Sequence, residues 1–347
     1  MDKKELIKGK NILITGGTGT VAYGLIKEIL KYGPSSIRIL SNDENGLFEY
    51  RTKFKNHHEL RYLIGDVRDR KRLDRSMTDI HLVLHTAALK HVWLCEYNPT
   101  EAIQTNILGI MNIIDASIKH EVEQVIFTSS DKAVNPSNVM GTTKLLGEKL
   151  ITSANFAKGK ARTRFSSVRF GNILGSRGSV VPLFRQQILS GEQVSITDKN
   201  MTRFVLTLQG AVELILDSAT KAVGGETFIL KMDVINVLDL YEAMVDILTP
   251  KEVLSKGRPK PKVIGRQPGE KLYEELMTME ELPRTKVLPG MFMVLPEGYK
   301  DYQALDYSKY DKYPRCKKVY RSDTQNALSR TAIKKLLNSG NIFDGPE

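Results

Sequence analysis

The sequence predicts an α/β protein with a doubly wound parallel sheet, and three observations support this fold class. Short, nearly continuous apolar segments recur along the first half of the chain, and amphipathic helical segments separate them. A glycine-rich turn joins the first apolar segment to the first helical one. The composition, 41% hydrophobic and 26% charged over 347 residues, is that of a globular protein with a sizeable core. Strands that helices cover on both faces show this continuous apolar pattern.

Six apolar segments are predicted to be strands of this sheet, because each is short and lies between helical or turn-forming stretches. A helix is expected over residues 21–33, where Gly33 and Pro34 end it, and another over 100–119. The six predicted strands are residues 11–15, 36–40, 60–66, 80–88, 124–130 and 165–174.

The stretch TGGTGTVA lies between the first strand and the first helix and has the spacing of a dinucleotide-binding turn. Gly16 and Gly19 allow a tight turn and a close approach of the backbone to a pyrophosphate, with Ala22 at the third position. The N–H groups at the start of the helix would face the phosphates. The motif is weak alone, but its place in this series of strands predicts a Rossmann-like nucleotide site. Further contacts are expected from Thr18, Thr20 and Val21.

The residues after the second strand usually decide between NAD and NADP. An acid there accepts from the ribose 2′-hydroxyl of NAD and repels the 2′-phosphate of NADP. Ser41 and Asn42 come first and could donate to a phosphate, whereas Asp43 could bind a ribose. We favour NADP, with NAD as the alternative. Asp66 is expected to accept from the adenine amino group or to cap the following helix, and the cofactor contacts are completed by Val67, Ala87 and Ala88.

The pattern loosens after about residue 171, so two parts of the chain are expected. Residues 1–170 are predicted to form the NAD(P)-binding domain. Residues 171–347 are predicted to form a smaller substrate-binding lobe, partly interleaved with the first domain. This half has a predicted helix at 181–190 and a helical stretch at 324–338.

A net charge of +11 raises the possibility of nucleic-acid or membrane-surface binding. The basic residues are scattered, with modest clusters at 251–262 and 308–322, and neither resembles an RNA-binding sheet or a metal site. We expect no nucleic-acid partner and no metal. We also expect no membrane segment, because no apolar run approaches roughly 20 residues. The start, MDKKELIKGK, lacks the apolar stretch of a signal peptide, and two cysteines fit a cytoplasmic location.

Eight motifs together resemble the extended short-chain dehydrogenase/reductases, and most closely their UDP-N-acetylglucosamine 4,6-dehydratases. The likeness runs from about residue 10 to 278, and the run from SSDKA to GTTK is specific to this group. The resemblance implies a nicotinamide cofactor, a UDP-sugar substrate and a part in surface-glycan biosynthesis. The motifs are TGGTGTVA, GDVRD, HTAALKHV, TNILG, SSDKAVNPSNVMGTTK, RFGNILGSRGSVVPLF, MTRF and PGEKLYEE.

The reaction of that family is redox-neutral overall and needs three proton-transferring groups. Hydride leaves sugar carbon 4, water is eliminated across carbons 5 and 6, and hydride returns to carbon 6. The resemblance implies that Asp131 is the acid at the 6-hydroxyl, Lys132 the base at carbon 5 and Lys144 the holder of the nicotinamide ribose. Without the resemblance, the favoured interpretation of Asp131 and Lys132 would be a salt-bridged pair in a surface turn.

Met140 stands where the wider family has a tyrosine base, four residues before Lys144. A thioether cannot transfer a proton in the working pH range. We expect the chemistry to have moved, with Ser130 relaying the 4-hydroxyl proton to Asp131 and Lys144 assisting. A subset of the family shares this methionine.

Other site residues follow from the resemblance alone. Lys90 is expected to touch cofactor phosphate or sugar, and Asn106 to support the cofactor site or simply to stabilise its helix. The diphosphate, uracil and ribose of UDP would be gripped by Asn172, Arg203 and Glu270. Many relatives have Arg directly before PGEK, whereas Gln267 stands here, so Arg266 is expected to substitute.

Three functions remain open from the sequence. The first is 4,6-dehydration of UDP-N-acetylglucosamine, with a slight preference for retention at carbon 5. The second is a UDP-sugar 4-epimerase or reductase on the same scaffold, and the third a catalytically silent NAD(P)-binding protein. A homo-oligomer is expected, with helices at 100–119 and 140–157 as the candidate interface.

Overall fold

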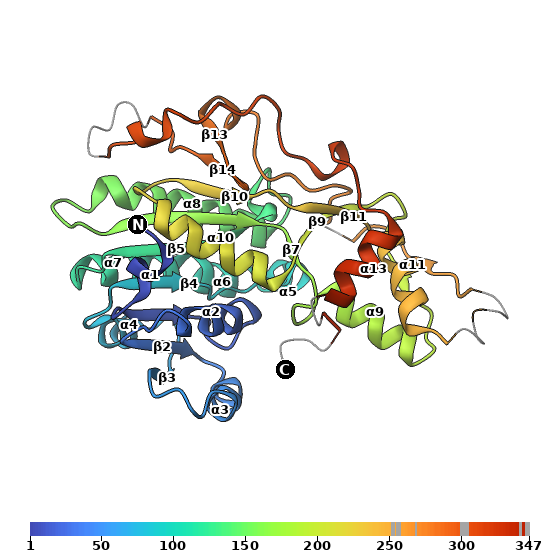
Figure 1. Ribbon diagram of the computed structural model, residues 1–347, viewed down its shortest axis with the longest axis horizontal. Coiled ribbons are helices and arrows are strands. Elements are labelled where there is room, and N and C mark those ends of the chain that lie inside the picture. The colour runs from blue at the N-terminus through green and yellow to red at the C-terminus, as the bar shows by residue number, and fades with distance from the viewer. Residues whose placement is uncertain (251–253, 255–257, 268, 299–304, 340–341, 344–347) are drawn as a thin grey trace.

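The computed structural model describes the chain except for residues 251–253, 255–257, 268, 299–304, 340–341 and 344–347. Part of the basic cluster at 251–262 therefore lies outside the described residues. A nine-stranded sheet forms the centre of the described structure, in the order β13-β14-β10-β6-β5-β4-β1-β2-β3 (Figure 1). Its strands are β1 (Asn11–Thr15), β2 (Ser36–Ser41), β3 (Leu60–Ile64), β4 (Leu82–His85), β5 (Gln124–Ser130), β6 (Arg164–Phe170), β10 (Thr227–Leu230), β13 (Thr285–Leu288) and β14 (Met291–Val294).

The seven strands from β10 to β3 are parallel, which confirms the predicted α/β class. Side chains alternate across the sheet, because successive residues of a strand point to opposite faces. On β1, Ile12 and Ile14 join one hydrophobic core and Leu13 joins another. At the other edge, β14 pairs antiparallel with β10 and β13, a hairpin that the sequence analysis did not predict.

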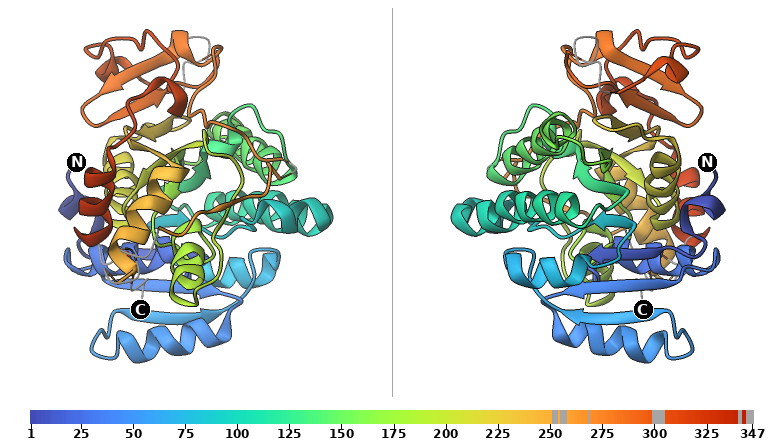
Figure 2. Two further views of the ribbon diagram at one scale, coloured as in Figure 1. Left: turned by 90° about the vertical axis from the view of Figure 1, so that its right-hand side faces the viewer. Right: turned by 90° about the vertical axis from the view of Figure 1, so that its left-hand side faces the viewer.

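Helices cover both faces of the large sheet (Figure 2). Packing among α1, α2 and α10 buries one face, and packing among α4, α7 and α8 buries the other. The helix α3 (Glu44–Lys53) follows β2 near the β3 edge. The two groups are α1 (Lys3–Ile7), α2 (Thr20–Leu30) and α10 (Leu208–Lys221) on one side, and α4 (Arg70–Met77), α7 (Gly109–Lys119) and α8 (Val139–Ala157) on the other.

Several predicted elements have different bounds in the structure. The segment 165–174 is interrupted at Gly171, because β6 ends at Phe170 and a separate β7 begins at Asn172. Gly171 lies so close to β9 that a Cβ there would be 2.7 Å from the Phe204 backbone oxygen. The helix at 100–119 is present, but a π-helical turn, Gln104–Leu108, separates α6 (Pro99–Ile103) from α7. The cap of α4 is Asp69, which accepts from Arg72 N, and not Asp66. The helix predicted at 324–338 begins only at Arg330.

A smaller part of the molecule lies beside the carboxyl ends of the parallel strands (Figure 1). Its core is a separate hydrophobic cluster between three helices and short strands. The chain after residue 171 nevertheless contributes α10, β10, β13 and β14 to the large part. Among the described residues, no helix combines the length and hydropathy needed to cross a bilayer. The smaller part contains α9 (Val180–Leu189), α11 (Val237–Leu248), α13 (Arg330–Ser339), the sheet β7 (Asn172–Ile173), β9 (Thr202–Leu206) and β11 (Asp233–Asn236), and the pair β8 (Ser195–Ile196) and β12 (Lys262–Val263).

Candidate active site

The predicted glycine turn follows β1 and leaves the start of α2 open. Gly16 has φ +65°, and a Cβ there would lie 2.7 Å from the backbone N and Cα of Ala87, so a side chain does not fit. Gly19 is the N-cap of α2 and supplies no side-chain cap, so the first N–H groups of the helix keep their capacity to bind an anion. This close, uncapped turn fits the pyrophosphate of a dinucleotide.

The segment after β2 is fixed by its own hydrogen bonds. The hydroxyls of Thr18 and Ser41 lie 2.9 Å apart, and Asp43 caps α3 by accepting from Gly46 N at 3.0 Å. The Asn42 amide donates to Asp66 at 3.3 Å. The carboxylate of Asp43 is therefore engaged by its own helix.

Asp66 is held in its ionised form at this edge of the site. Burial alone would raise the pKa of Asp66, but hydrogen bonds from Arg68 outweigh it and lower that pKa. The Arg68 guanidinium lies 2.7 Å from the Asp66 carboxylate. Asp66 therefore offers an accepting carboxylate.

The loop after β4 is positioned by Asn106, which is buried in the π-helical turn. Its side-chain oxygen accepts from Leu89 N at 2.8 Å, and its amide donates to Leu89 O and to the Thr143 hydroxyl, both at 3.0 Å. Asn106 thus fixes the loop that contains Ala87 and Ala88. Because these bonds use its polar atoms, Asn106 stabilises the loop after β4 in this structure.

Val67 and Lys90 occupy different positions around the predicted cofactor site. Val67 is buried, and a Cβ on Gly109 would lie 2.8 Å from its side chain. Lys90 donates to the backbone oxygen of Arg177 at 2.6 Å, and Arg177 lies in the loop that leads into α9. Burial, and then the charge of Arg177, lower the pKa of Lys90. Arg177 itself donates to Thr18 O, so this loop reaches the glycine turn.

Asp131, which is buried, and Lys132, which is partly exposed, form an acid–amine pair in the short 3-10 helix directly after β5. Asp131 is 2% exposed, and its Oδ1 accepts from Ser130 Oγ at 2.5 Å. The Lys132 ammonium lies 3.1 Å from the same oxygen. Burial alone would raise the pKa of Asp131, but the charge of Lys132 outweighs it and lowers that pKa to about 2. Asp131 and Lys132 are therefore an ion pair in which the acid is buried and the amine is partly exposed.

Lys144 enters the site from α8, whose start packs closely against this pair. A Cβ on Gly141 would lie 2.2 Å from Lys132 O, so the helix and the turn are in direct contact. Lys144 is 6% exposed, and its ammonium donates to Thr128 O at 2.9 Å and lies 4.8 Å from the centre of the Phe127 ring. Burial lowers the pKa of Lys144 to about 8.

Met140 is buried in a small apolar cluster with Cys95 and Ala102. Its backbone oxygen accepts from the Thr143 hydroxyl at 2.8 Å. The thioether therefore packs between helices.

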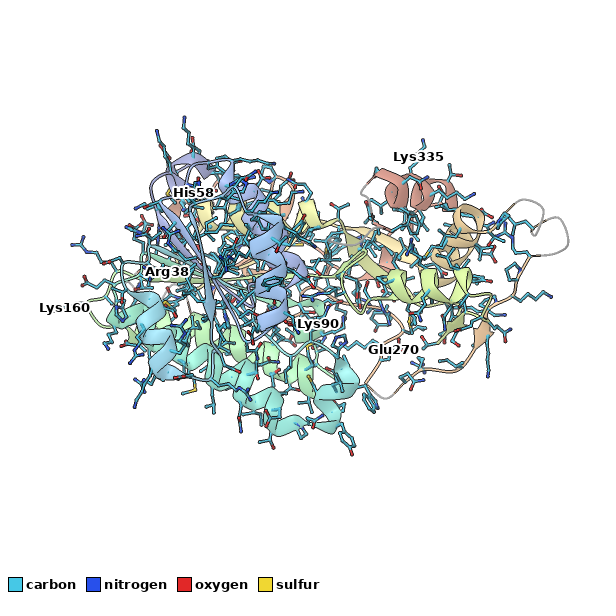
Figure 3. The ribbon with its side chains drawn as sticks, turned by 90° about the horizontal axis from the view of Figure 1, so that it is seen from below. Arg38, His58, Lys90, Lys160, Glu270 and Lys335 are labelled. Carbon is cyan, nitrogen blue, oxygen red and sulfur yellow. The ribbon has the colours of Figure 1, made fainter. Side chains whose placement is uncertain are left out.

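Three of the four predicted UDP-binding residues come together. Arg203 lies 3.5 Å from Glu270, and Asn172 donates to Phe204 O at 3.0 Å beside it. Arg266 is exposed, and the described contacts do not bring it into this group. Figure 3 labels Lys90 and Glu270, which in that view lie where the two parts of the molecule meet.

Glu274 is a site residue that the sequence analysis missed, although it belongs to the motif PGEKLYEE. It is 5% exposed, and its Oε1 lies 3.5 Å from Lys132 Nζ and 3.3 Å from Arg203 Nε. Its Oε2 accepts from the Asn172 amide at 2.8 Å. Burial, and then the charge of Asp131, raise the pKa of Glu274 to about 7. Glu274 therefore connects Asp131 and Lys132 to the predicted substrate group.

These features define an extended short-chain dehydrogenase/reductase, with a nucleotide turn after β1 and polar groups at the carboxyl ends of β4, β5 and β6. Residues 12–296 match the family model described as "Polysaccharide biosynthesis protein". The chain belongs to this family, within the branch that includes the UDP-N-acetylglucosamine 4,6-dehydratases.

Several known proteins are similar over nearly the whole chain. A UDP-N-acetylglucosamine 4,6-dehydratase (inverting) of Campylobacter jejuni is 39% identical over 98% of this chain and 100% of its own length. An uncharacterized membrane protein of Methanocaldococcus jannaschii is 46% identical, covering 97% of each chain. A UDP-glucose 4-epimerase of Rickettsia rickettsii is 36% identical over 94% of this chain and 95% of its own.

Among solved structures, the X-ray structure of Pen from Bacillus thuringiensis superposes with a TM-score of 0.89. The two chains are 43% identical, and the match covers 97% of this chain and 99% of that one. The large sheet and the smaller part are therefore arranged in this protein as they are in Pen.

Proposed function

We propose that the protein is a hydro-lyase that dehydrates UDP-N-acetylglucosamine to a UDP-4-keto-6-deoxy sugar. The observation that carries the proposal is the hydrogen-bonded set Ser130, Asp131 and Lys132 at the end of β5, in which the Asp131 carboxyl is buried. Elimination of water needs an acid at the leaving hydroxyl and a base at carbon 5, and this pair supplies one of each. The similarity to the C. jejuni dehydratase supports the same reaction.

The cofactor we propose is NADP, with NAD as the alternative. Gly16 and Gly19 would hold its pyrophosphate, and Lys144 its nicotinamide ribose. Ser41 and Asn42 are neutral and would not repel a 2′-phosphate as an acid would, and the Asp43 carboxylate is engaged in capping α3. When bound, the cofactor accepts hydride from sugar carbon 4 and returns it to carbon 6.

Protons move through this chain's own side chains. Ser130 Oγ takes the proton of the 4-hydroxyl while its own proton passes to Asp131 Oδ1, over the 2.5 Å contact between them. Asp131 then protonates the departing 6-hydroxyl, which leaves as water. Lys132 takes the proton from carbon 5. Met140 has no part in these transfers because it is packed in an apolar cluster.

The UDP moiety would be held by the smaller part of the molecule, for which residues 171–347 supply the strands and helices. Asn172, Arg203 and Glu270 provide an amide, a guanidinium and a carboxylate for diphosphate, uracil and ribose. Lys90 lies at the boundary with the nucleotide turn. Arg266, which is exposed, would have to move to contact uridine.

The configuration at carbon 5 is a separate question. The motifs favour retention, whereas both C. jejuni relatives are named inverting, at 39% and 42% identity. We propose inversion, because these relatives match most of the chain and not single motifs. Inversion requires that the new proton reach carbon 5 on the face opposite Lys132.

We further propose a cytoplasmic homo-oligomer. Large apolar side chains are exposed on the π-helical turn, on α7 and on α8, within the helices expected to form the interface, and also on the neighbouring α5 (Val92–Tyr97). A second copy of the chain would cover them. Light scattering of the purified protein tests this assembly. These exposed residues are Trp93, Tyr97, Leu108, Met111 and Leu146.

Proton NMR of UDP-N-acetylglucosamine incubated with the protein and NADP in deuterated water tests the function. A 6-deoxy-4-keto product is expected, and its ring couplings report the configuration at carbon 5. The similarity to the R. rickettsii protein favours one other function, a UDP-sugar 4-epimerase. A 4-epimer without a 6-deoxy product would establish that alternative, and no reaction on any UDP-sugar would favour a silent binding protein.

A further inference from the structure

The site contains a conflict between the state of Lys132 and the role proposed for it. A base at carbon 5 must be a neutral amine. Burial alone would lower the pKa of Lys132, but the charges of Asp131 and Glu274 outweigh it and raise that pKa. The resting side chain is therefore an ammonium, 3.1 Å from one carboxylate and 3.5 Å from the other. Its proton must leave before it can act.

Asp131 is not free to take this proton. The reaction releases one water per turnover, and the proton that joins the departing 6-hydroxyl comes, by mass balance, from the 4-hydroxyl. Asp131 receives that proton through Ser130, and a carboxylate holds only one. If Lys132 also discharged onto Asp131, the 4-hydroxyl proton would have no acceptor.

We propose that Glu274 is a positioning residue that takes the proton of Lys132 and so converts this lysine into the base. The inference rests on the proposed function, and it assigns a role to a residue outside the acid–base pair. Glu274 Oε1 faces Lys132 Nζ at 3.5 Å from a buried position. The Asn172 amide and Phe204 N, both bonded to Oε2, hold the carboxyl group in place.

The groups around Glu274 explain why it can both hold and release a proton. From the turn after β5 it faces the anion Asp131 and the cation Lys132, and from β9 the guanidinium of Arg203 at 3.3 Å. Lys271 on its own segment is also within electrostatic reach. Burial and Asp131 favour the neutral carboxyl, whereas Lys132 and Arg203 favour the charged one. The pKa of Glu274 lies at about 7 as a result.

With Glu274 as the acceptor, every proton moved in the reaction has a donor and an acceptor. Before elimination, Ser130 delivers the 4-hydroxyl proton to Asp131, and Lys132 passes its proton to Glu274. The carbon 5–hydrogen bond then breaks toward Lys132 Nζ, while the Asp131 proton joins the 6-hydroxyl and water leaves. Lys132 is again an ammonium, Asp131 is ionised and Glu274 is protonated. Glu274 is discharged to Lys132 if that lysine reprotonates carbon 5, or to water if water protonates the opposite face.

The pH dependence of turnover tests the proposal, with Glu274→Gln as the variant. In the wild type the rate should rise as Glu274 ionises, through about pH 7. Gln keeps an oxygen for the Asn172 amide but cannot accept a proton. In E274Q we expect kcat to fall by about 10²–10⁴-fold with KM little changed, and the acidic limb of the profile to move to alkaline pH.

Glu275→Gln is the matched control. Glu275 is the adjacent, half-buried acid, and it bonds the Asn135 amide at 2.9 Å. We expect E275Q to keep the wild-type profile. An E274Q profile equal to the wild type would overturn the proposal and show that Lys132 releases its proton to solvent. If E274Q fails to fold, Glu274→Asp serves as the second variant, because it keeps a carboxyl group and should keep the acidic limb of the pH–rate profile. Loss of that limb in E274D would also overturn the proposal.

An infrared titration of the ligand-free protein separates this proposal from the proposed function. We expect a carboxyl band that disappears near pH 7 in the wild type and in E275Q but is missing from E274Q. If no UDP-sugar is dehydrated, the function fails, and this band alone decides whether Glu274 is a proton acceptor poised near neutrality. If the wild type shows no such band, Glu274 does not take up a proton near neutral pH and the proposal is overturned.

Discussion

Arg169 on β6 fastens the segment that follows Glu274 to the large sheet, and the cost of removing it can be worked out. The side chain is 1% exposed. Its guanidinium donates to both carboxylate oxygens of Glu148 on α8, at 3.0 and 2.5 Å, and to both of Glu281, each at 3.0 Å. It also donates to Leu276 O at 2.8 Å. One buried cation therefore pairs with a buried anion, Glu148, and with a partly buried one, Glu281.

Arg169→Met removes the cation and leaves both carboxylates without it. Taking one partner from a buried ion pair costs about 3–5 kcal/mol in the free energy of unfolding. With an unfolding entropy of about 2.1 cal/mol/K per residue over 347 residues, each kcal/mol lowers Tm by roughly 1.4 °C. The variant should therefore melt about 4–7 °C below the wild type at neutral pH.

The stability that R169M loses relative to the wild type should increase with pH. Burial alone would raise the pKa of Glu281, but the charge of Arg169 outweighs it and lowers that pKa. The stabilisation of the wild type by the charged Glu281 is present above the pKa of glutamate in the unfolded chain, about 4.3, and is lost as the pH falls. In R169M, burial of Glu281 is no longer offset by the guanidinium and raises its pKa, so the folded variant holds an extra proton and loses stability as the pH rises.

Thermal unfolding followed by circular dichroism at about pH 5 and about pH 8 measures both effects. The deficit of R169M relative to the wild type should be larger at the higher pH. The triple variant E148Q/R169M/E281Q removes all three charges and should recover most of the loss. The reasoning is refuted if R169M melts within about 1 °C of the wild type at both pH values, or if the triple variant is no more stable than R169M.

Further predictions concern the cofactor turn and the proton-transferring groups. Gly16→Ala should abolish cofactor binding in a fluorescence titration, because its Cβ would lie 2.7 Å from the Ala87 backbone; binding within a few-fold of wild type would contradict the turn assignment. Lys132→Ala should remove dehydration in the NMR assay, and normal turnover would exclude it as the carbon-5 base. Met140→Tyr should change the rate only modestly, because the side chain packs away from the proton path; a large gain would restore a role for tyrosine. Activity should fall as the pH rises through about 8, where Lys144 loses its charge, and Lys144→Arg should move that limb to higher pH; an unmoved limb would assign it to another group.

The sequence predicted the parallel sheet and its nucleotide turn because both depend on local patterns. Continuous apolar segments specify strands, and Gly16 marks a turn that only glycine can make. The hairpin of β13 and β14 was missed because it joins the sheet from the far end of the chain, where no local pattern indicates its partner. The break at Gly171 lies against Phe204, a contact between distant segments that the sequence alone does not show.

The same distinction holds for the site. Ser130, Asp131 and Lys132 are consecutive, so their proximity follows from the chain itself. Glu274 was passed over because its importance comes from burial beside Lys132, 142 residues away in sequence. Arg266 was predicted from its position before a motif, and the structure leaves it exposed.

The central claim is that hydride leaves carbon 4 and returns to carbon 6 within one site while Asp131 and Lys132 remove water. UDP-N-acetylglucosamine carrying deuterium at carbon 4, incubated with the protein and unlabelled NADP, tests it directly by NMR and mass spectrometry. The account predicts a 4-keto product with the deuterium in its 6-methyl group. Deuterium that stays at carbon 4 of a 4-epimer would contradict the account and identify an epimerase.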